Sequence, residues 1–279
     1  MRRNFAQILK EAKIDIKSEY KKLYGMLFDR TIQVSPSKWI SAYDELSSHF
    51  LEFYFRGTCL SLEEFDDING FHFDKEPEPF NIDNLIMLCE YIQNMLMGYQ
   101  STSAAGYLPT INVQFYWMQI SRVIEEVGYM PLRQDGFVTF VEKSPAAISV
   151  AENEQIPQEI SYKVFSYNHH SMKGNLQEKK NTILKLAELL EAKRPQLSKV
   201  DSGFCNDLFY LFNNLNLRHN NIDPSMKGKF KQAVAEMSPE ELEHWYDETY
   251  QMCLLAFLRL EQEERKIEVD KLKSRIEGI

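Results

Sequence analysis

Apolar residues recur at helical spacing along most of the chain. One stripe follows Asn81, and two more occupy residues 110–127 and 177–194. An apolar face that repeats every three or four residues is typical of a helix packed against a core. The last helix is expected to begin at Pro239 and to run well past Leu260. The pattern therefore predicts a mainly α fold built from one or more helical bundles.

Local sequence signals predict where these helices begin and end. Ser238 stands three positions before a glutamate, as in a capping box, and Asn81 is a suitable N-cap. Ser35 followed by Pro36 predicts a further helix start. The helix over residues 177–194 is expected to end near Pro195, because proline lacks the N–H group that a helix interior needs.

Residues 129–142 interrupt the helical pattern. An Asp-Gly pair at positions 135 and 136 lies between two stretches rich in strand-forming residues. Such a pair favours a tight turn between antiparallel strands. The sequence therefore predicts one small β-hairpin near residues 129–142.

The polar stretch at residues 151–157 is the expected boundary between two parts of the chain. Residues 1–152 are predicted to form a mostly helical N-terminal part that contains the hairpin. Residues 153–279 are predicted to form a helical C-terminal part. The two parts are either separate domains or packed as one unit, and the sequence leaves both arrangements open.

Composition places the chain among ordinary globular proteins. Of its 279 residues, 44% are apolar and 13% aromatic, which argues against disorder. The sequence holds no run of about 18 apolar residues that would span a bilayer, and Lys10 and Glu11 interrupt the apolar region that a signal peptide requires. We therefore expect a cytoplasmic protein without membrane association. The four cysteines are widely spaced beside apolar neighbours, which predicts buried free thiols.

The net charge of −9 is unevenly distributed along the chain. Residues 163–231 contain twelve Lys or Arg and six Asp or Glu, so this region carries +6 and the rest of the chain carries −15. Two interpretations remain open. The basic residues lie on solvated helix faces, or they form one surface for phosphate groups or an acidic partner.

Motifs of several large enzyme classes are missing from the sequence. It contains no glycine-rich nucleotide motif, no nucleophile elbow and no paired histidines of the zinc-protease type. This argues against most nucleotide-binding, nicotinamide-dependent, hydrolase and zinc-protease functions. Neither a metal nor a cofactor is predicted.

A first polar cluster precedes the helix that starts near residue 177. It contains His169, His170, Lys173 and Asn175, with a glycine at position 174. Two histidines and a lysine at a helix start could hold an anion against unpaired backbone amides. The structural alternative is a plain loop between helices in which Asn175 is the N-cap.

A second polar cluster surrounds Arg218 and His219. In the structural interpretation, Arg218 lies in the last turn of a helix, where the macrodipole favours a cation, and Asn220 or Asn221 takes the left-handed cap conformation. In the functional interpretation, Arg218 clamps a phosphate or a transition state, and His219 is an acid or base because imidazole titrates near neutral pH. A third cluster contains Asp247, which could pair with Arg218 or orient a histidine.

Several short segments of residues 167–265 carry a resemblance to a known group of proteins. They are Tyr167-Asn168-His169-His170, Gly174-Asn175, the Asn-Leu-Arg-His-Asn-Asn run at residues 216–221, and Glu243-His244-Trp245-Tyr246-Asp247. In these segments the chain resembles abortive-infection and HEPN-type helical proteins of bacteria. The resemblance implies a helical bundle, often dimeric. Many HEPN domains are metal-independent ribonucleases in which an Arg stabilises the phosphoryl transition state and a His on the same helix face helps to activate the ribose 2′-hydroxyl.

The chain departs from that arrangement at the residues that would carry the chemistry. The family's His lies a few residues beyond the Arg, whereas residues 222–224 are Ile, Asp and Pro and His219 is adjacent to Arg218. Adjacent residues on a helix point about 100° apart. A histidine from elsewhere, His169 or His170, would have to take that place in space.

The leading hypothesis is a cytoplasmic helical interaction protein within a bacterial phage-defence or stress module, with a protein partner or a homodimer. One alternative is a metal-independent HEPN-like endoribonuclease in which Arg218 is the clamp, and His219 with His169 or His170 supplies the acid and base. Another is an RNA-binding protein without cleavage. The residues assigned to phosphate or partner binding are Lys173, Asn175, Asn220 and Asp247.

Overall fold

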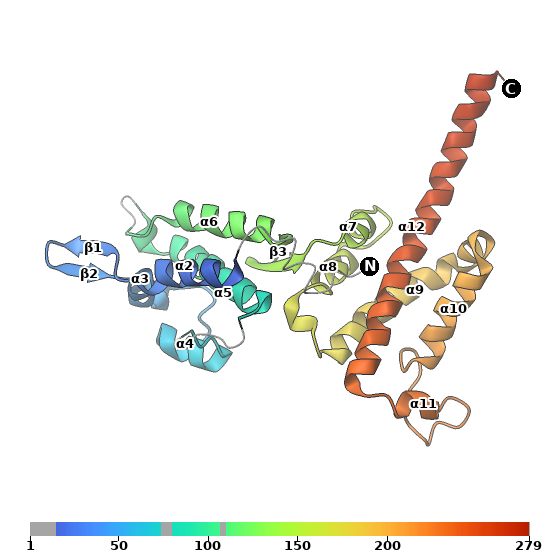
Figure 1. The fold of residues 1–279 in the computed structure, drawn as a ribbon, viewed down its shortest axis with the longest axis horizontal. Coiled ribbons are helices and arrows are strands. Elements are labelled where there is room, and N and C mark those ends of the chain that lie inside the picture. The colour runs from blue at the N-terminus through green and yellow to red at the C-terminus, as the bar shows by residue number, and fades with distance from the viewer. Residues whose placement is uncertain (1–14, 74–79, 107–109, 279) are drawn as a thin grey trace. The chain divides into compact units, whose positions relative to one another are not determined.

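The computed structural model describes residues 15–73, 80–106 and 110–278. Helices account for most of these residues, together with two antiparallel two-stranded sheets (Figure 1). The predicted mainly α fold with a small hairpin is confirmed. The chain divides into two compact units, an N-terminal unit of Met1–Phe140 and a C-terminal unit of Val141–Ile279. Each unit has its own apolar core.

The N-terminal unit is organised around one helix that is buried on nearly every side. This helix, α5 (Ile82–Gln100), begins at Asn81, whose side chain accepts a hydrogen bond from the Asn84 N–H while the Asn84 side chain accepts one from the Asn81 N–H. The predicted start at Asn81 is therefore confirmed. The surrounding elements are α2 (Ile16–Phe28), β1 (Ile32–Ser35), β2 (Lys38–Ile40), α3 (Ala42–His49), η1 (Phe50–Glu52), α4 (Leu62–Asn69), η2 (Ser103–Ala105), α6 (Val113–Glu126), β3 (Tyr129–Gln134) and β4 (Phe137–Glu142).

The predicted hairpin is formed by β3 and β4. Asp135 and Gly136 connect the strands with φ values of 51° and 83°. Two consecutive positive φ angles are the requirement of a type I′ turn, whose twist matches that of the strands. The local turn signal was therefore sufficient to predict this element.

A second hairpin, β1–β2, was not predicted. Ser35 pairs with Lys38 across it, and Pro36 lies in the turn between the strands. The predicted helix start at Ser35 and Pro36 is therefore wrong. Proline fixes the same φ angle at the second position of a turn as at the start of a helix, so the local signal does not distinguish the two.

The C-terminal unit is entirely helical apart from the end of β4. Its elements are α7 (Pro145–Ala151), α8 (Gln158–Ser166), η3 (His170–Met172), α9 (Leu176–Val200), α10 (Ser202–Asn214), α11 (Gln232–Ala235) and α12 (Pro239–Glu277). The unit begins at Val141, before the boundary predicted at 152/153. The physical reason is that Ala147 and Val150 of α7 are buried in the core of the C-terminal unit.

Helix α9 continues through Pro195 to Val200, so the predicted end near Pro195 is wrong. Leu197, beyond the proline, is fully buried in the core of the unit. Its packing offsets the hydrogen bond that the proline cannot donate. Local propensity is thus overridden here by tertiary contacts.

Helix α12 begins as predicted and is the longest helix of the described residues. Ser238 accepts a hydrogen bond from the Glu241 N–H at 3.2 Å, and Pro239 occupies the first turn. From there the helix runs to Glu277, and its second half extends beyond α9 and α10 (Figure 1). No helix in the described part of the chain combines the length and the apolar character that crossing a bilayer requires. The four cysteines are buried free thiols, as predicted.

A buried carboxylate, Asp66, fixes α4 against the rest of the N-terminal unit. The hydroxyl of Tyr43 donates to Asp66 Oδ2 at 2.8 Å and that of Tyr91 at 2.9 Å. Burial raises the pKa of Asp66 from 3.8 to about 6, and the two tyrosine hydrogen bonds oppose this shift only in part. Asp66 therefore titrates at a higher pH in the folded chain than in the unfolded one.

This shift predicts a pH dependence of stability. Between about pH 4 and pH 6 the folded unit holds a proton on Asp66 that the unfolded chain releases, so the free energy of unfolding falls as the pH rises through this window. Asp66→Asn is expected to remove this decrease, which amounts to up to about 3 kcal/mol. Urea unfolding at several pH values measures it. The exposed neighbour Asp67 provides the control, since Asp67→Asn should leave the profile nearly unchanged. Equal profiles for wild type and Asp66→Asn would contradict the prediction.

Candidate functional site

Arg218 and His219 lie in a loop rather than on a helix. Helix α10 ends at Asn214, and the chain then turns at Asn216, which has a φ of 51°. The Arg218 N–H donates to the Phe212 carbonyl at 3.0 Å and closes this turn. The expected left-handed cap at Asn220 or Asn221 is therefore wrong, because the chain reverses earlier.

A buried asparagine holds this loop in place. Asn221 is fully buried; its Oδ1 accepts a hydrogen bond from the Asn216 N–H at 2.9 Å, and its Nδ2 donates to the Lys229 carbonyl at 2.6 Å. The Lys231 N–H donates to the Asn221 carbonyl at 2.8 Å. A buried amide satisfied on both sides fixes backbone geometry. The asparagine-rich run thus has a structural role at this position.

The guanidinium of Arg218 is occupied by contacts within its own unit. Its Nη2 lies 2.5 Å from Glu191 Oε2 and donates to the Ala187 carbonyl at 3.3 Å, both on α9. The same group lies over the rings of Phe209 and Phe212, with centroid distances of 5.5 and 5.1 Å. Within the described residues, Arg218 is therefore a packed and paired cation that links α9 to α10.

The two residues after Arg218 also have local partners. Lys229 Nζ lies 3.3 Å from His219 Nε2, and because an ammonium only donates, this contact needs an unprotonated ring nitrogen. Asn220 is exposed and its Nδ2 donates to Asp223 Oδ2 at 3.5 Å. Both contacts lie within the same loop, so they tie the loop to itself.

The segment around His169 and His170 forms a short turn before α9. His169 is the N-cap of η3, and its Nδ1 accepts a hydrogen bond from the Ser171 N–H at 3.2 Å. The two imidazole rings lie side by side with centroids 4.2 Å apart. Lys173 is exposed at the end of this turn. Asn175 accepts from the Glu178 N–H at 3.2 Å, so its predicted role as the N-cap of the following helix is confirmed.

Asp247 belongs to a charged cluster around the buried Lys179. Lys179 Nζ lies 2.5 Å from Glu243 Oε1 and 2.8 Å from Asp247 Oδ1. The Tyr167 hydroxyl donates to the same Asp247 oxygen at 2.9 Å, and the Gly174 N–H donates to Glu243 Oε1 at 2.9 Å. Asp247 does not pair with Arg218, which was one of the two roles considered for it, because the Arg218 guanidinium pairs with Glu191. The five residues are called the Lys179 cluster below.

The spacing of the charged residues in the sequence contains a signal for the Lys179 cluster. Lys179 precedes Ile183 and Leu186 at helical spacing, so it stands in the buried register of α9. A lysine in that register needs a partner to compensate its charge. Glu243 and Asp247 are four residues apart and share one face of α12. The spacing does not show that α9 and α12 meet at Lys179.

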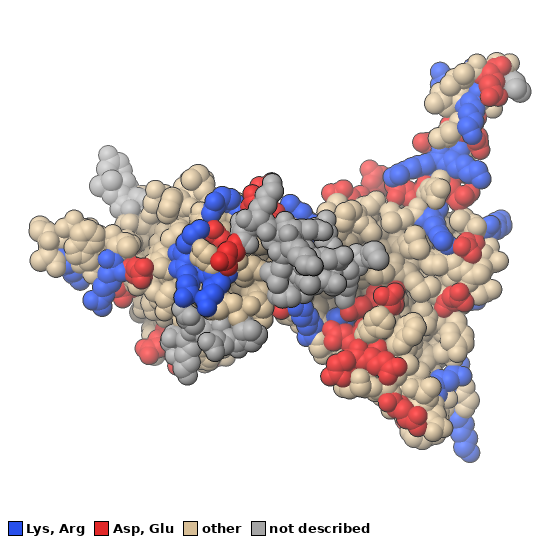
Figure 2. Space-filling view, in the orientation of Figure 1, with Lys and Arg blue, Asp and Glu red and all other residues tan. Residues whose placement is uncertain are grey.

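The basic region of residues 163–231 does not form one continuous patch on the face that Figure 2 shows. There the Lys and Arg side chains of the C-terminal unit lie at separate places with acidic side chains among them (Figure 2). Lys179 is buried, and Arg218, Arg194 and Lys185 have carboxylates of α9 within 4.0 Å. These four cations are therefore at least partly neutralised within the unit.

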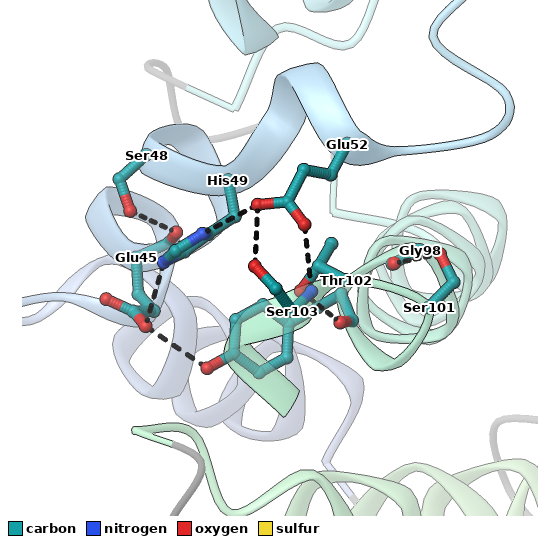
Figure 3. A network of polar contacts seen from close by, with 9 residues as sticks. Glu45, Ser48, His49, Glu52, Gly98, Ser101, Thr102 and Ser103 are labelled. Atoms are coloured by element: carbon teal, nitrogen blue, oxygen red, sulfur yellow. Dashed lines mark hydrogen bonds and ion pairs between the residues drawn. The ribbon is translucent and has the colours of Figure 1, made fainter. Parts of the chain in front are cut away.

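The N-terminal unit contains a polar cluster around His49 (Figure 3). His49 stands between two carboxylates, with Nε2 3.6 Å from Glu45 Oε1 and Nδ1 3.4 Å from Glu52 Oε1. The Tyr99 hydroxyl donates to Glu45 Oε1 at 3.1 Å. Ser103 donates to Glu52 twice, through its N–H at 2.8 Å and its hydroxyl at 3.1 Å. The three residues on α3 and η1 are spaced by four and then three positions, a one-face pattern visible in the sequence.

The geometry of this cluster differs from that of a catalytic triad. The backbone N–H of Ser103, and then its hydroxyl, hold the pKa of Glu52 below its usual value. Both ring nitrogens of His49 face carboxylates, and the Ser103 hydroxyl donates to a carboxylate. In a catalytic triad the serine instead hydrogen-bonds to the imidazole. The cluster therefore ties α3 and η1 to the residues that follow α5.

A pocket of about 570 Å³ lies between the end of α5 and the start of α6. Its described lining contains amide and apolar side chains and lacks a group that titrates near neutral pH, so it offers no acid or base to a bound molecule. The lining residues are Gln100, Ala105, Ile111, Asn112, Val113 and Gln114.

Comparison of the chain with models of protein families, with characterised proteins and with solved structures finds no match.

The Lys179 cluster predicts a specific pattern of stability changes. Lys179→Met removes the positive charge of the cluster and leaves the partly buried carboxylates of Glu243 and Asp247 beside an apolar side chain, which is expected to cost about 2–3 kcal/mol in the free energy of unfolding. Adding Glu243→Gln and Asp247→Asn should recover most of this loss. The more exposed Lys185 provides the control, since Lys185→Met should change the stability by less than about 1 kcal/mol. Urea unfolding measures all three, and a mild effect of Lys179→Met alone would show that the cluster is not a major stabilising contact.

Proposed function

We propose that this protein acts by binding, as a cytoplasmic helical interaction protein within a bacterial phage-defence or stress module. The bacterial setting is proposed from the likeness of residues 167–265 to abortive-infection and HEPN-type proteins. Binding is favoured over catalysis because the residues best suited to chemistry have other roles. Arg218 is paired with Glu191, and Asp247 is paired with Lys179.

The observation that carries this proposal is the exposed second half of α12. From Glu264 to Gly278 every residue is exposed, although four of them have large apolar side chains. An exposed helix with several apolar residues favours a partner that covers them. The four residues are Ile267, Val269, Leu272 and Ile276, with exposed fractions of 57%, 48%, 51% and 75%.

The proposal is tested by cross-linking from defined positions of this helix. A photoreactive amino acid in place of Val269 or Leu272 is expected to form a covalent adduct with a partner in bacterial cells, because these positions would be covered in the complex. The same amino acid in place of Ile267, which lies on the opposite side of the helix, should form little adduct. Mass spectrometry identifies the adducts. Their absence at Val269 and Leu272, or equal yields at all three positions, would contradict a docking role.

Cleavage of RNA distinguishes the binding proposal from the endoribonuclease alternative. We expect purified protein to leave RNA intact in the presence of a chelator, because the Arg218 guanidinium is engaged by Glu191 and His219 is not aligned with it on a helix. Gel analysis of RNA incubated with wild type, Arg218→Lys and His219→Ala would detect cleavage. Cleavage by wild type that both variants lose would reverse the conclusion and assign these residues to catalysis.

A further inference from the structure

Helix α12 carries a heptad pattern on the side that points away from its own core. The positions are Gln262, Arg265, Val269, Leu272 and Ile276, with alternating spacings of three and four residues. In a heptad written abcdefg, they are a, d, a, d and a. The same spacing continues toward the N-terminus at Leu258 and Leu255.

The buried face of α12 uses other positions of the same heptad. Cys253 and Leu260 are f positions and Phe257 is a c position, and all three are packed in the core of the C-terminal unit. Leu255, at an a position on the same stretch of helix, is 41% exposed. Positions a and d lie on the opposite side of a helix from b, c and f. Beyond Leu260, where the described residues of α12 include none that is buried, a second helix can therefore approach the a and d face without displacing the core.

We propose that the a and d face of α12 pairs with the same face of a second copy of this chain in a parallel, two-stranded coiled coil. This inference rests on the proposed docking role of the helix and specifies its partner. The paired region extends from Gln262 to Ile276, and the preceding d position, Leu258, packs against the core of the C-terminal unit.

Charge complementarity points to a second copy in parallel orientation. In a parallel pair, each g position lies beside the e position of the next heptad on the partner. The g positions here are Glu261, Glu268 and Arg275, and the e positions in the heptads that follow the two glutamates are Lys266 and Lys273. Both pairs bring opposite charges together. In an antiparallel pair, e positions face e positions, so Lys266 and Lys273 would meet as like charges.

The apolar residues agree with the same arrangement. Val269 and Ile276 are β-branched and occupy a positions, while Leu272 occupies the d position between them. This combination favours two parallel strands over larger assemblies. Arg265, at the preceding d position, pairs with Glu261 on its own helix. Its long side chain can extend outward along the interface, and the polar a and d positions at 262 and 265 make the association reversible rather than permanent.

The oligomeric state of the full chain tests the proposal. Sedimentation velocity over a range of concentrations is expected to show a monomer–dimer equilibrium for wild type. Leu272→Glu should weaken dimerisation by at least about tenfold, because it places a carboxylate in each copy at the apolar centre of the interface. Ile267→Glu is the matched control, since it introduces the same charge at an equally exposed apolar position on the outer face and should leave the equilibrium unchanged. A wild type that stays monomeric at all concentrations, or a dimer that Leu272→Glu does not weaken, would overturn the proposal.

Charge reversal tests the orientation and does not depend on the apolar residues. Glu268→Lys and Lys273→Glu should each weaken the dimer by bringing like charges together, and the double variant should restore it. If Lys273→Glu strengthens the dimer instead, by pairing with Lys266 of the other copy, the helices are antiparallel and the proposal fails. If the purified chain is monomeric and Val269 cross-links to a different protein, the helix still has a docking role. Its partner is then not a second copy of this chain. The failure of this inference is thus distinguishable from the failure of the proposed function.

Discussion

The compensation of one buried lysine charge organises the C-terminal unit. Lys179 lies near the start of α9, and its two carboxylate partners lie one turn apart on α12, so the three charges determine where these helices cross. Tyr167 adds a hydroxyl to the same cluster, and its ring stacks on Tyr250 with centroids 3.8 Å apart. An uncompensated charge at this depth would be strongly unfavourable. The cluster therefore also specifies how α12 enters the core.

The same physical requirement explains the contacts of Arg218, Asn221 and His49. Arg218 lies against two phenylalanine rings and has Glu191 as its counter-ion, and Asn221 holds the loop through three backbone groups. In the N-terminal unit, His49 is likewise enclosed by Glu45 and Glu52. In each place, complementary groups within the unit satisfy the polar atoms, which is what burial demands. The exposed apolar residues of α12 are different, because they lack such partners within the unit that contains them.

Sequence reasoning succeeded where the determinant was local and failed where it was not. The turn at Asp135 and the helix start at Asn81 depend on neighbouring residues, and both were predicted. The continuation of α9 beyond Pro195 depends on a core that only the folded unit creates. For the candidate site, the residues were recognised but their partners were not. Arg218 and Glu191 are far apart along the chain, and no periodicity relates one to the other.

The two faces of helix α12 are under different constraints. Its b, c and f positions must satisfy the packing of a core, whereas its a, d, e and g positions beyond Leu260 make few contacts within the unit. Substitutions on the outer face can therefore accumulate over evolution at little expense to folding. A few substitutions among the outward side chains of α12 could change which helix this face binds. The core that holds α12 in place would stay the same.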